Sequence, residues 1–298
     1  VPPPVASVVS PGSATAQTGG TANASFTIGN TGGSALDYTI ANSGQAATGV
    51  YDASDTGISS GFRNTVYTDP ATAGNAAQFA ADDFDVIEPT QITSLKTTGF
   101  VVSGAALATA AVNFTWSIYP DAAGLPAGNP QTAAAAAVWS YTATPTSAGV
   151  TVDASSIRLN LAAAGQNVTL PPGKYWLLVN TRGTFANRWA QFASNTGNGS
   201  FASITIATSG AGAWASNTAF PGLSMQVRGL VACGAPWLGT AFPASGSLFP
   251  TETRTHQVIL DATGLSAATY RANVCVNSND PVSPSLAVPI TFTVTSPP

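Results

Sequence analysis

The sequence predicts an all-β protein built from half-buried antiparallel strands, and three observations support that fold class. Apolar and polar residues alternate with a period of two in many short runs, which is typical of strands with one buried face. Turn signals such as NTGG at 30–33 and LPPGK at 170–174 separate these runs. Helical periodicity is almost absent, since the one alanine-rich run, 132–138, is short and lies beside Asn-Pro.

The expected strands follow one another along the whole chain. The clearest alternating runs are 22–28, 36–40, 112–118, 157–161, 223–227 and 286–294. Pro289 interrupts the strand expected from the last run. A proline cannot donate a hydrogen bond to a central ladder, so we expect this strand at the edge of a sheet.

Composition excludes several classes of function. Only 7% of the 298 residues are charged and the formal net charge is −4, while 44% are hydrophobic, enough to form cores. Lys and Arg form no cluster, so the basic surface of a nucleic-acid binder is missing. No apolar run approaches the roughly 18 residues of a membrane helix. Two cysteines and few lysines predict a secreted protein, and the start at Val1 predicts a processed chain.

The two ends of the chain resemble the two halves of one known module. The cues are NTGGSALDYTI (30–40), PWLG (236–239), ATGLSAATYRANVCVNSNDP (262–281) and VPITFTV (288–294). Together they resemble the bacterial extracellular Ig-like module related to the ASPM/SPD-2/Hydin group. The resemblance implies a discontinuous Ig-like β-sandwich formed by 1–48 plus 232–298, with no activity of its own and a place on the bacterial cell surface.

Residues 49–231 are inserted where that group usually has a short loop. Their runs WSIYPD (116–121) and LPPGKYWLLV (170–179) resemble jelly-roll modules of secreted bacterial proteins. The resemblance implies an inserted jelly-roll-like β-sandwich over 49–231. Insertion into an exposed loop is physically easy, because closure entropy grows slowly with loop length.

The two cysteines, Cys233 and Cys275, are expected to form a disulfide. A nucleophilic cysteine needs a base, and the single histidine, His256, shares a strand face with Val258 and should point to the core. A structural zinc site needs about four N/S ligands, more than the chain offers. Cys275 shares its face with polar neighbours such as Asn273, which makes a buried filler the less favoured role.

We expect no enzyme. GISSG at 57–61 matches a nucleophile elbow, but that motif works only on a strand-to-helix turn, and the sequence lacks the helices. With one histidine and few lysines, the usual acid–base and nucleophilic constellations cannot be assembled.

Two sets of residues are candidates for binding. Asp82, Asp83 and Asp85 lie within four residues, and their hard oxygens suit Ca²⁺, although solvated turn aspartates are the simpler alternative. No other cofactor is expected. The second set could stack on a glycan or, as aromatic residues in sandwiches usually do, fill the core. It consists of Tyr119, Trp139, Trp176 and Trp189.

The leading hypothesis is a non-enzymatic extracellular structural or adhesive protein, a self-assembling subunit of a secreted or cell-surface filament. A charge-poor surface permits close contact between subunits. The N-terminal segment could add a strand to a neighbour's sheet, so self-association through sheet edges or termini is expected. The residues of this candidate inter-subunit strand are Val5, Ala6, Ser7, Val8 and Val9. The alternative is a C-terminal accessory module of a secreted bacterial hydrolase that binds a glycan or a surface protein.

Overall fold

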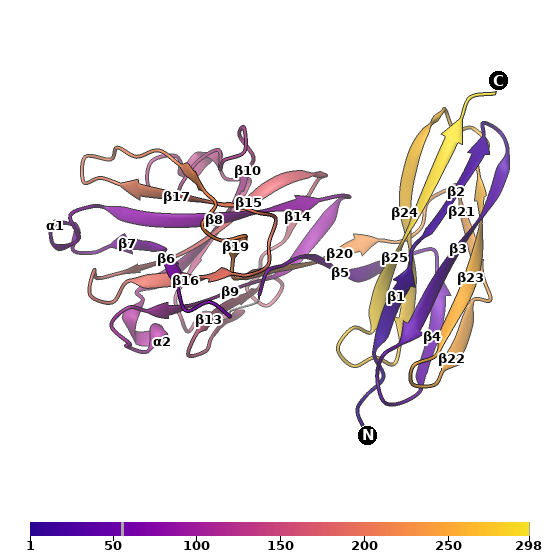
Figure 1. Ribbon diagram of the computed structural model, residues 1–298, viewed down its shortest axis with the longest axis horizontal. Helices are drawn as coiled ribbons and strands as arrows, with labels where there is room; N and C mark the ends of the chain where they lie inside the picture. The colour runs from indigo at the N-terminus through magenta and orange to yellow at the C-terminus, as the bar shows by residue number, and fades with distance from the viewer. Residues whose placement is uncertain (55–56, 298) are drawn as a thin grey trace. The chain divides into compact units, whose positions relative to one another are not determined.

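The protein is almost entirely β, as the alternating runs predicted. The computed structural model describes residues 1–54 and 57–297, with 56% of the chain in strands and 4% in helices (Figure 1). The all-β sandwich fold is therefore confirmed. The chain divides into two compact units, Val1–Thr48 with Leu230–Pro298 as unit 1 and Gly49–Gly229 as unit 2. Strands β5 (Gln45–Asp52) and β20 (Met225–Ala232) contain the two boundaries.

Unit 1 is a sandwich of two sheets. Its remaining strands are β1 (Ala6–Ser10), β2 (Gly12–Gln17), β3 (Thr21–Asn30), β4 (Leu36–Ala41), β21 (Leu238–Phe242), β22 (Ser245–Leu248), β23 (Thr253–Asp261), β24 (Ala268–Ser278) and β25 (Ser285–Thr295). One sheet has the order β1-β3-β23-β21, and the strands of the other are β2, β25, β24, β4 and β22. Strand β2 runs parallel to β25, whereas β24, β4 and β22 pair in antiparallel fashion.

The core of unit 1 lies between these two sheets. Phe26 and Val258 point inward from one sheet, and Val274, Ile290 and Phe292 point inward from the other. All five side chains are buried. These are the apolar positions of the alternating runs, so period-two patterning identified the inner faces of both sheets.

The edge position predicted for the last strand was wrong. Strand β25 has neighbours on both sides, because β24 pairs with it along its length and β2 pairs with its second half. Pro289 lies opposite Asn273 of β24. On the other side of β25, β5 pairs at Leu286 and β2 begins to pair at Ile290. Pro289, which has no N–H group, therefore lies between the position where β5 pairs with β25 and the position where β2 begins to pair with it.

Unit 2 also consists of two sets of strands. They and the short helices are β6 (Gly61–Arg63), β7 (Thr65–Tyr67), α1 (Pro70–Ala73), β8 (Ala77–Val86), β9 (Thr90–Val101), α2 (Leu107–Ala110), β10 (Asn113–Pro120), the 3-10 turn η1 (Ala134–Ala136), β11 (Trp139–Ala143), β12 (Val150–Val152), β13 (Ser156–Asn160), β14 (Val168–Leu170), β15 (Gly173–Gly183), β16 (Trp189–Ser194), β17 (Phe201–Ile206), β18 (Ala215–Asn217) and β19 (Gly222–Leu223). One sheet has the order β11-β10-β15-β7-β8-β17-β18, and the second set is grouped around β9. The alanine-rich run contains a single 3-10 turn, as its short length suggested.

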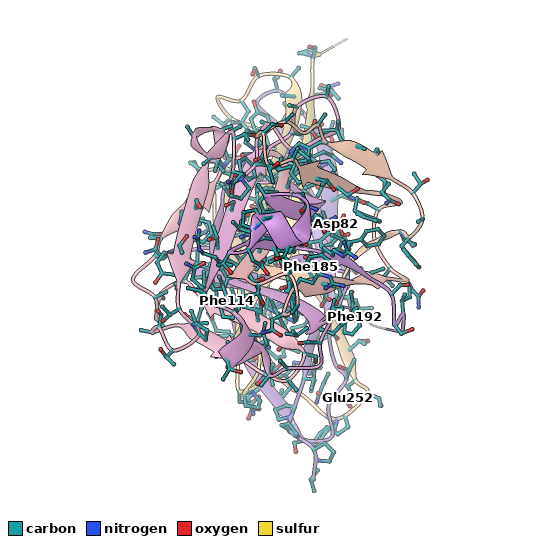
Figure 2. All side chains as sticks on the ribbon, turned by 90° about the vertical axis from the view of Figure 1, so that its left-hand side faces the viewer. Asp82, Phe114, Phe185, Phe192 and Glu252 are labelled. Atoms are coloured by element: carbon teal, nitrogen blue, oxygen red, sulfur yellow. A yellow bond between two sulfur atoms is a disulfide. The ribbon has the colours of Figure 1, made fainter. Side chains whose placement is uncertain are left out.

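The main core of unit 2 is formed by the inner face of the β10–β15 sheet. Phe114 and Trp116 of β10 and Leu177 of β15 pack there with Leu95 and Leu159 of the β9 set (Phe114 is labelled in Figure 2). All five are buried.

A second apolar cluster covers part of the outer face of the same sheet. Trp176, Leu178 and Ile204 point outward from β15 and β17 and pack beneath Trp214. The Trp214 Nε1–H donates a hydrogen bond to the Gly128 carbonyl oxygen at 3.0 Å, which ties two loops together. Long loops thus bury outward residues that alternation alone would place in solvent.

Candidate functional site

The predicted disulfide is present between Cys233 and Cys275. Cys233 directly follows β20, and Cys275 lies within β24. The sulfurs pack with Ala46 and Ala287 in a small buried cluster, and Asn273 on the same strand face is also buried. The face of Cys275 is therefore interior rather than polar and exposed, although the bridge itself is confirmed.

His256 is a structural residue in the core of unit 1. Its side chain is fully buried. Nδ1 donates to the Pro243 carbonyl oxygen at 2.7 Å, so Nε2 is left to accept a hydrogen bond from the Tyr38 hydroxyl at 3.0 Å. Burial lowers the pKa of His256, an effect that the Pro243 carbonyl opposes and Arg254 reinforces. Both ring nitrogens are thus committed to the fold.

The structure does not bring the three candidate calcium ligands together. Asp83 forms an ion pair with Lys174, and Asp85 on the same strand face is exposed. Asp82 points to the opposite face and is fully buried (labelled in Figure 2). Within residues 1–54 and 57–297 no three His, Cys, Asp or Glu side chains are grouped to hold a metal ion.

The four candidate aromatic residues do not form an exposed platform. Tyr119, Trp176 and Trp189 are buried, and only Trp139 is partly exposed. Trp139 stacks at 6.4 Å on Tyr141 rather than standing free. The glycan-stacking interpretation of this set is therefore corrected. At Trp176 both faces of β15 are covered, which leaves this ring no solvent-facing surface.

The segment Val5–Val9 is already paired within its own chain. Its residues Ala6–Val9 belong to β1, which pairs with β3, with Ala6 opposite Asn30 and Val8 opposite Ile28. The Ala6 N–H also donates to Asp280 Oδ2 at 3.0 Å. Strand β1 is an edge strand of its sheet, so the prediction that this segment adds a strand to a neighbour's sheet stays untested by the pairing within the chain.

A polar groove of about 350 Å³ lies on the outer face of the β10–β15 sheet in unit 2. Three adjacent strands form its floor, since β10 lies between β11 and β15. Thr115 of β10 is opposite both Asn180 of β15 and Thr142 of β11. Side chains alternate along a strand, so these three share the face opposite to Phe114 and Trp116. The same strands are thus apolar inside and polar in the groove.

Hydroxyl groups line the strand β11 side of the groove. Thr115 Oγ1 and Thr142 Oγ1 lie 2.9 Å apart, and Ser117 Oγ and Ser140 Oγ lie 3.1 Å apart. Ser140 donates its proton to the Trp116 carbonyl oxygen at 3.2 Å, so Ser117 donates to Ser140. These pairs align the two strands and leave oxygen lone pairs available to a ligand.

One wall of the groove is a tight turn that starts at Asn129. The Asn129 Oδ1 accepts hydrogen bonds from the backbone N–H groups of Gln131 at 3.0 Å and Thr132 at 2.9 Å. An asparagine that bonds its own downstream backbone in this way fixes a turn without help from other segments. The turn holds Pro130, Gln131 and Ala134 against the groove.

Two side chains of the groove have polar atoms that are buried without a hydrogen-bond partner among the described residues. They are the Oδ1 of Asn180, which is 2% exposed, and the hydroxyl of Tyr119, which is fully buried. The Nδ2 of Asn180 makes only a long bond, 3.4 Å, to the Thr181 carbonyl oxygen. Burial raises the pKa of Tyr119 to about 12. A buried polar atom without a partner costs about 1–3 kcal/mol, so such atoms are uncommon in native proteins.

Sequence reasoning missed this groove, although part of its signal was present. Asn113, Thr115 and Ser117 are the polar members of the predicted alternating run 112–118, a pattern that does not distinguish a groove from an ordinary solvent face. Their partners Ser140 and Asn180 lie 23 residues or more away along the chain. No local pattern shows which strands become neighbours, so the groove appears only in the assembled sheet.

No family model and no curated protein matches the chain. The resemblance of its ends to the Ig-like module related to the ASPM/SPD-2/Hydin group therefore stays a prediction. No helix among the described residues is long and apolar enough to cross a membrane.

Proposed function

We propose that the protein is a non-enzymatic extracellular adhesion module that binds a polyhydroxylated ligand, a glycan, in the polar groove of unit 2. The observation that carries this proposal is the Asn180 carbonyl oxygen, which is buried in the groove without a partner. An unsatisfied acceptor lowers the stability of the free protein. A ligand hydroxyl that donates to it, once the Asn180 side chain turns toward the groove, removes this cost, so the free energy appears as affinity.

The chemistry of the groove suits sugar hydroxyls. A sugar hydroxyl both donates and accepts, and the groove offers acceptors at Asn180 Oδ1 and at the Thr and Ser oxygens. Its volume is near the lower end of the range of small-molecule sites, about 300–1,000 Å³. We therefore assign one or two sugar residues to the groove rather than a long chain.

An extracellular location fits the covalent structure. A disulfide that closes a long stretch of chain is typical of proteins that fold in an oxidising compartment. The Ig-like and jelly-roll resemblances suggest the same setting and belong to this proposal. The proposal that the protein is not an enzyme is supported by the state of its most reactive side chains. Both cysteines are bridged, and both ring nitrogens of His256 form hydrogen bonds inside the core.

Binding to immobilised oligosaccharides tests this proposal. The test compares wild-type protein with Asn180→Leu on an oligosaccharide array and measures the affinity of positive ligands by calorimetry. We expect Asn180→Leu to lose at least tenfold in affinity while its thermal midpoint stays the same or rises, because an unsatisfied polar group is removed. The control is Thr169→Val, which changes an exposed residue of β14, a strand that pairs with β9 and does not line the groove. This variant should bind like wild type. Failure of the wild type to bind any sugar, or unchanged binding by Asn180→Leu, contradicts the proposal.

Self-association is the second candidate function, and an exposed face of unit 1 favours it. Phe242 is 79% exposed and Ile259 is 59% exposed, on the outer face of the β1-β3-β23-β21 sheet. Pairing at the edges of this sheet is disfavoured, because the register shifts between Val8 and Ser10 in β1 and between Leu238 and Ala241 in β21. Association would therefore use the sheet face.

Sedimentation velocity tests the self-association. We expect wild-type protein to form oligomers at high concentration and Ile259→Thr to weaken them. Val282→Thr removes an apolar side chain that is 83% exposed in a loop and serves as the matched control. A concentration-independent monomer would exclude the filament subunit.

A further inference from the structure

The charge of the groove indicates which kind of glycan it takes. We infer that the ligand is an acidic sugar whose carboxylate is held by Arg182 at the mouth of the groove. This inference rests on the proposed function and adds to it the chemical class of the ligand.

Arg182 is the one charged residue that lines the groove. Its side chain is exposed, and among the described residues the single ion pair joins Lys174 to Asp83, so Arg182 has no carboxylate partner there. No acidic residue lines the groove to neutralise the guanidinium or to repel an anion. In a chain with only 7% charged residues, the groove therefore has an uncompensated positive charge.

The strand register places this charge next to the buried polar floor. Arg182 and Asn180 are two positions apart on β15, so they share one face with Cα atoms roughly 7 Å apart. On the neighbouring strand β10, Asn113 lies opposite Arg182 and Thr115 lies opposite Asn180. One small ligand can thus reach the guanidinium with one substituent and the Asn180 carbonyl with another.

The guanidinium group selects a planar anion. Its parallel N–H groups match the two oxygens of a carboxylate, and such bidentate pairs are about twice as strong as neutral hydrogen bonds. Val66 lies beside Arg182 through the parallel pairing of β7 with β15 and lines the groove, which limits water access on that side. A sugar acid supplies both a carboxylate for Arg182 and hydroxyls for the floor.

The test uses trigalacturonate and its fully methyl-esterified form, which has the same hydroxyls and no charge. Titration calorimetry at low salt compares both ligands with wild-type protein, Arg182→Gln and Arg182→Lys. We expect wild type to bind the acid about tenfold more tightly than the ester, Arg182→Gln to bind both equally, and Arg182→Lys to recover part of the preference. Arg158→Gln, the same change at an exposed position of β13, should behave like wild type.

Each failure has its own meaning. Equal affinity of wild type for acid and ester overturns the carboxylate assignment but leaves the groove as a neutral-glycan site. A sulfated trisaccharide that binds more tightly than trigalacturonate also overturns it, since the guanidinium would then hold a tetrahedral anion. If neither ligand binds while a neutral sugar on the array binds in an Asn180-dependent way, this inference fails and the proposed function stands. If no sugar of any kind binds, both fail.

Discussion

The Asp82 carboxyl lies inside unit 2 and accepts hydrogen bonds from the Leu223 N–H at 2.7 Å and the Tyr51 hydroxyl at 3.3 Å. Burial raises the pKa of Asp82 to about 7, an effect that the Leu223 N–H opposes and the Asp83 charge reinforces. Folding therefore favours the protonated acid at this position. The same residue in an unfolded chain ionises near pH 4.

Stability should depend on pH through Asp82. Between pH 4 and 7 the folded protein holds a proton that the unfolded chain has lost, so the free energy of unfolding falls as pH rises, and the loss is complete above 7. Asp82→Asn keeps an acceptor for the Leu223 N–H and removes the titration. From pH 5 to pH 8 we expect wild type to lose about 2 to 3 kcal/mol relative to this variant in urea unfolding.

The difference in unfolding free energy between wild type and Asp82→Asn isolates the contribution of Asp82 to the pH dependence. His256 titrates in the opposite sense, because its lowered pKa makes stability rise with pH, but it is present in both proteins and cancels in the difference. Parallel stability curves for wild type and Asp82→Asn would show that Asp82 is ionised in the folded state throughout.

The roles of single residues were predictable from the sequence where they depended on few other residues. The bridge between Cys233 and Cys275 followed from the scarcity of other thiol or metal partners, and the inward orientation of His256 followed from strand alternation. The roles of Asp82 and Trp176 were not predictable, because each depends on a covering segment far away in the sequence. Loops bury Trp176 on the outer face, and the Leu223 N–H reaches Asp82 from 141 residues along the chain.

The disulfide joins β24 to the segment that follows β20, at the point where the chain returns to unit 1. Gly234, the next residue, has φ 92° and would place a Cβ 1.8 Å from the Asn42 carbonyl oxygen, so only glycine fits there. The segment is further held by the Cys233 N–H, which donates to the Gly44 carbonyl oxygen at 2.9 Å. Covalent and backbone bonds thus fix the same short segment.

Removal of the disulfide should destabilise unit 1 selectively. The bridge closes a loop of 42 residues, which corresponds to about 4 kcal/mol of chain entropy. In Cys233→Ala/Cys275→Ala we expect the urea transition of unit 1 to move to lower concentration while that of unit 2 stays in place. Wild type unfolded in the presence of reductant should match the variant. An unchanged unit 1 transition would mean that packing alone holds the segment.

Strands were predictable from the sequence, whereas their neighbours were not. Alternation located the inner faces of β3, β4, β10 and β25, since that pattern depends only on local geometry. We missed the central position of β25, because we inferred an edge strand from Pro289 alone, without knowing which strands pair with β25. Two different strands share the second side of β25, and only their register shows that the proline falls between them.

At the scale of the whole molecule, the proposed function depends on contacts between distant parts of unit 2. The groove draws its floor from β10, β11 and β15, and its wall from the turn at Asn129. Its polar residues look like an ordinary solvent face in each run taken alone. The lack of basic clusters predicts that nucleic acid is not the ligand, but composition could not indicate which surface binds.

The central claim is that the groove of unit 2 binds a sugar, and nuclear magnetic resonance titration tests it most directly. Isotope-labelled protein would be titrated with trigalacturonate and with the best neutral sugar from the array. We predict that the shifted signals include the side-chain amide of Asn180 and the methyl groups of Thr115 and Thr142. Saturable shifts confined to another part of the chain, or none at millimolar sugar, would contradict the account.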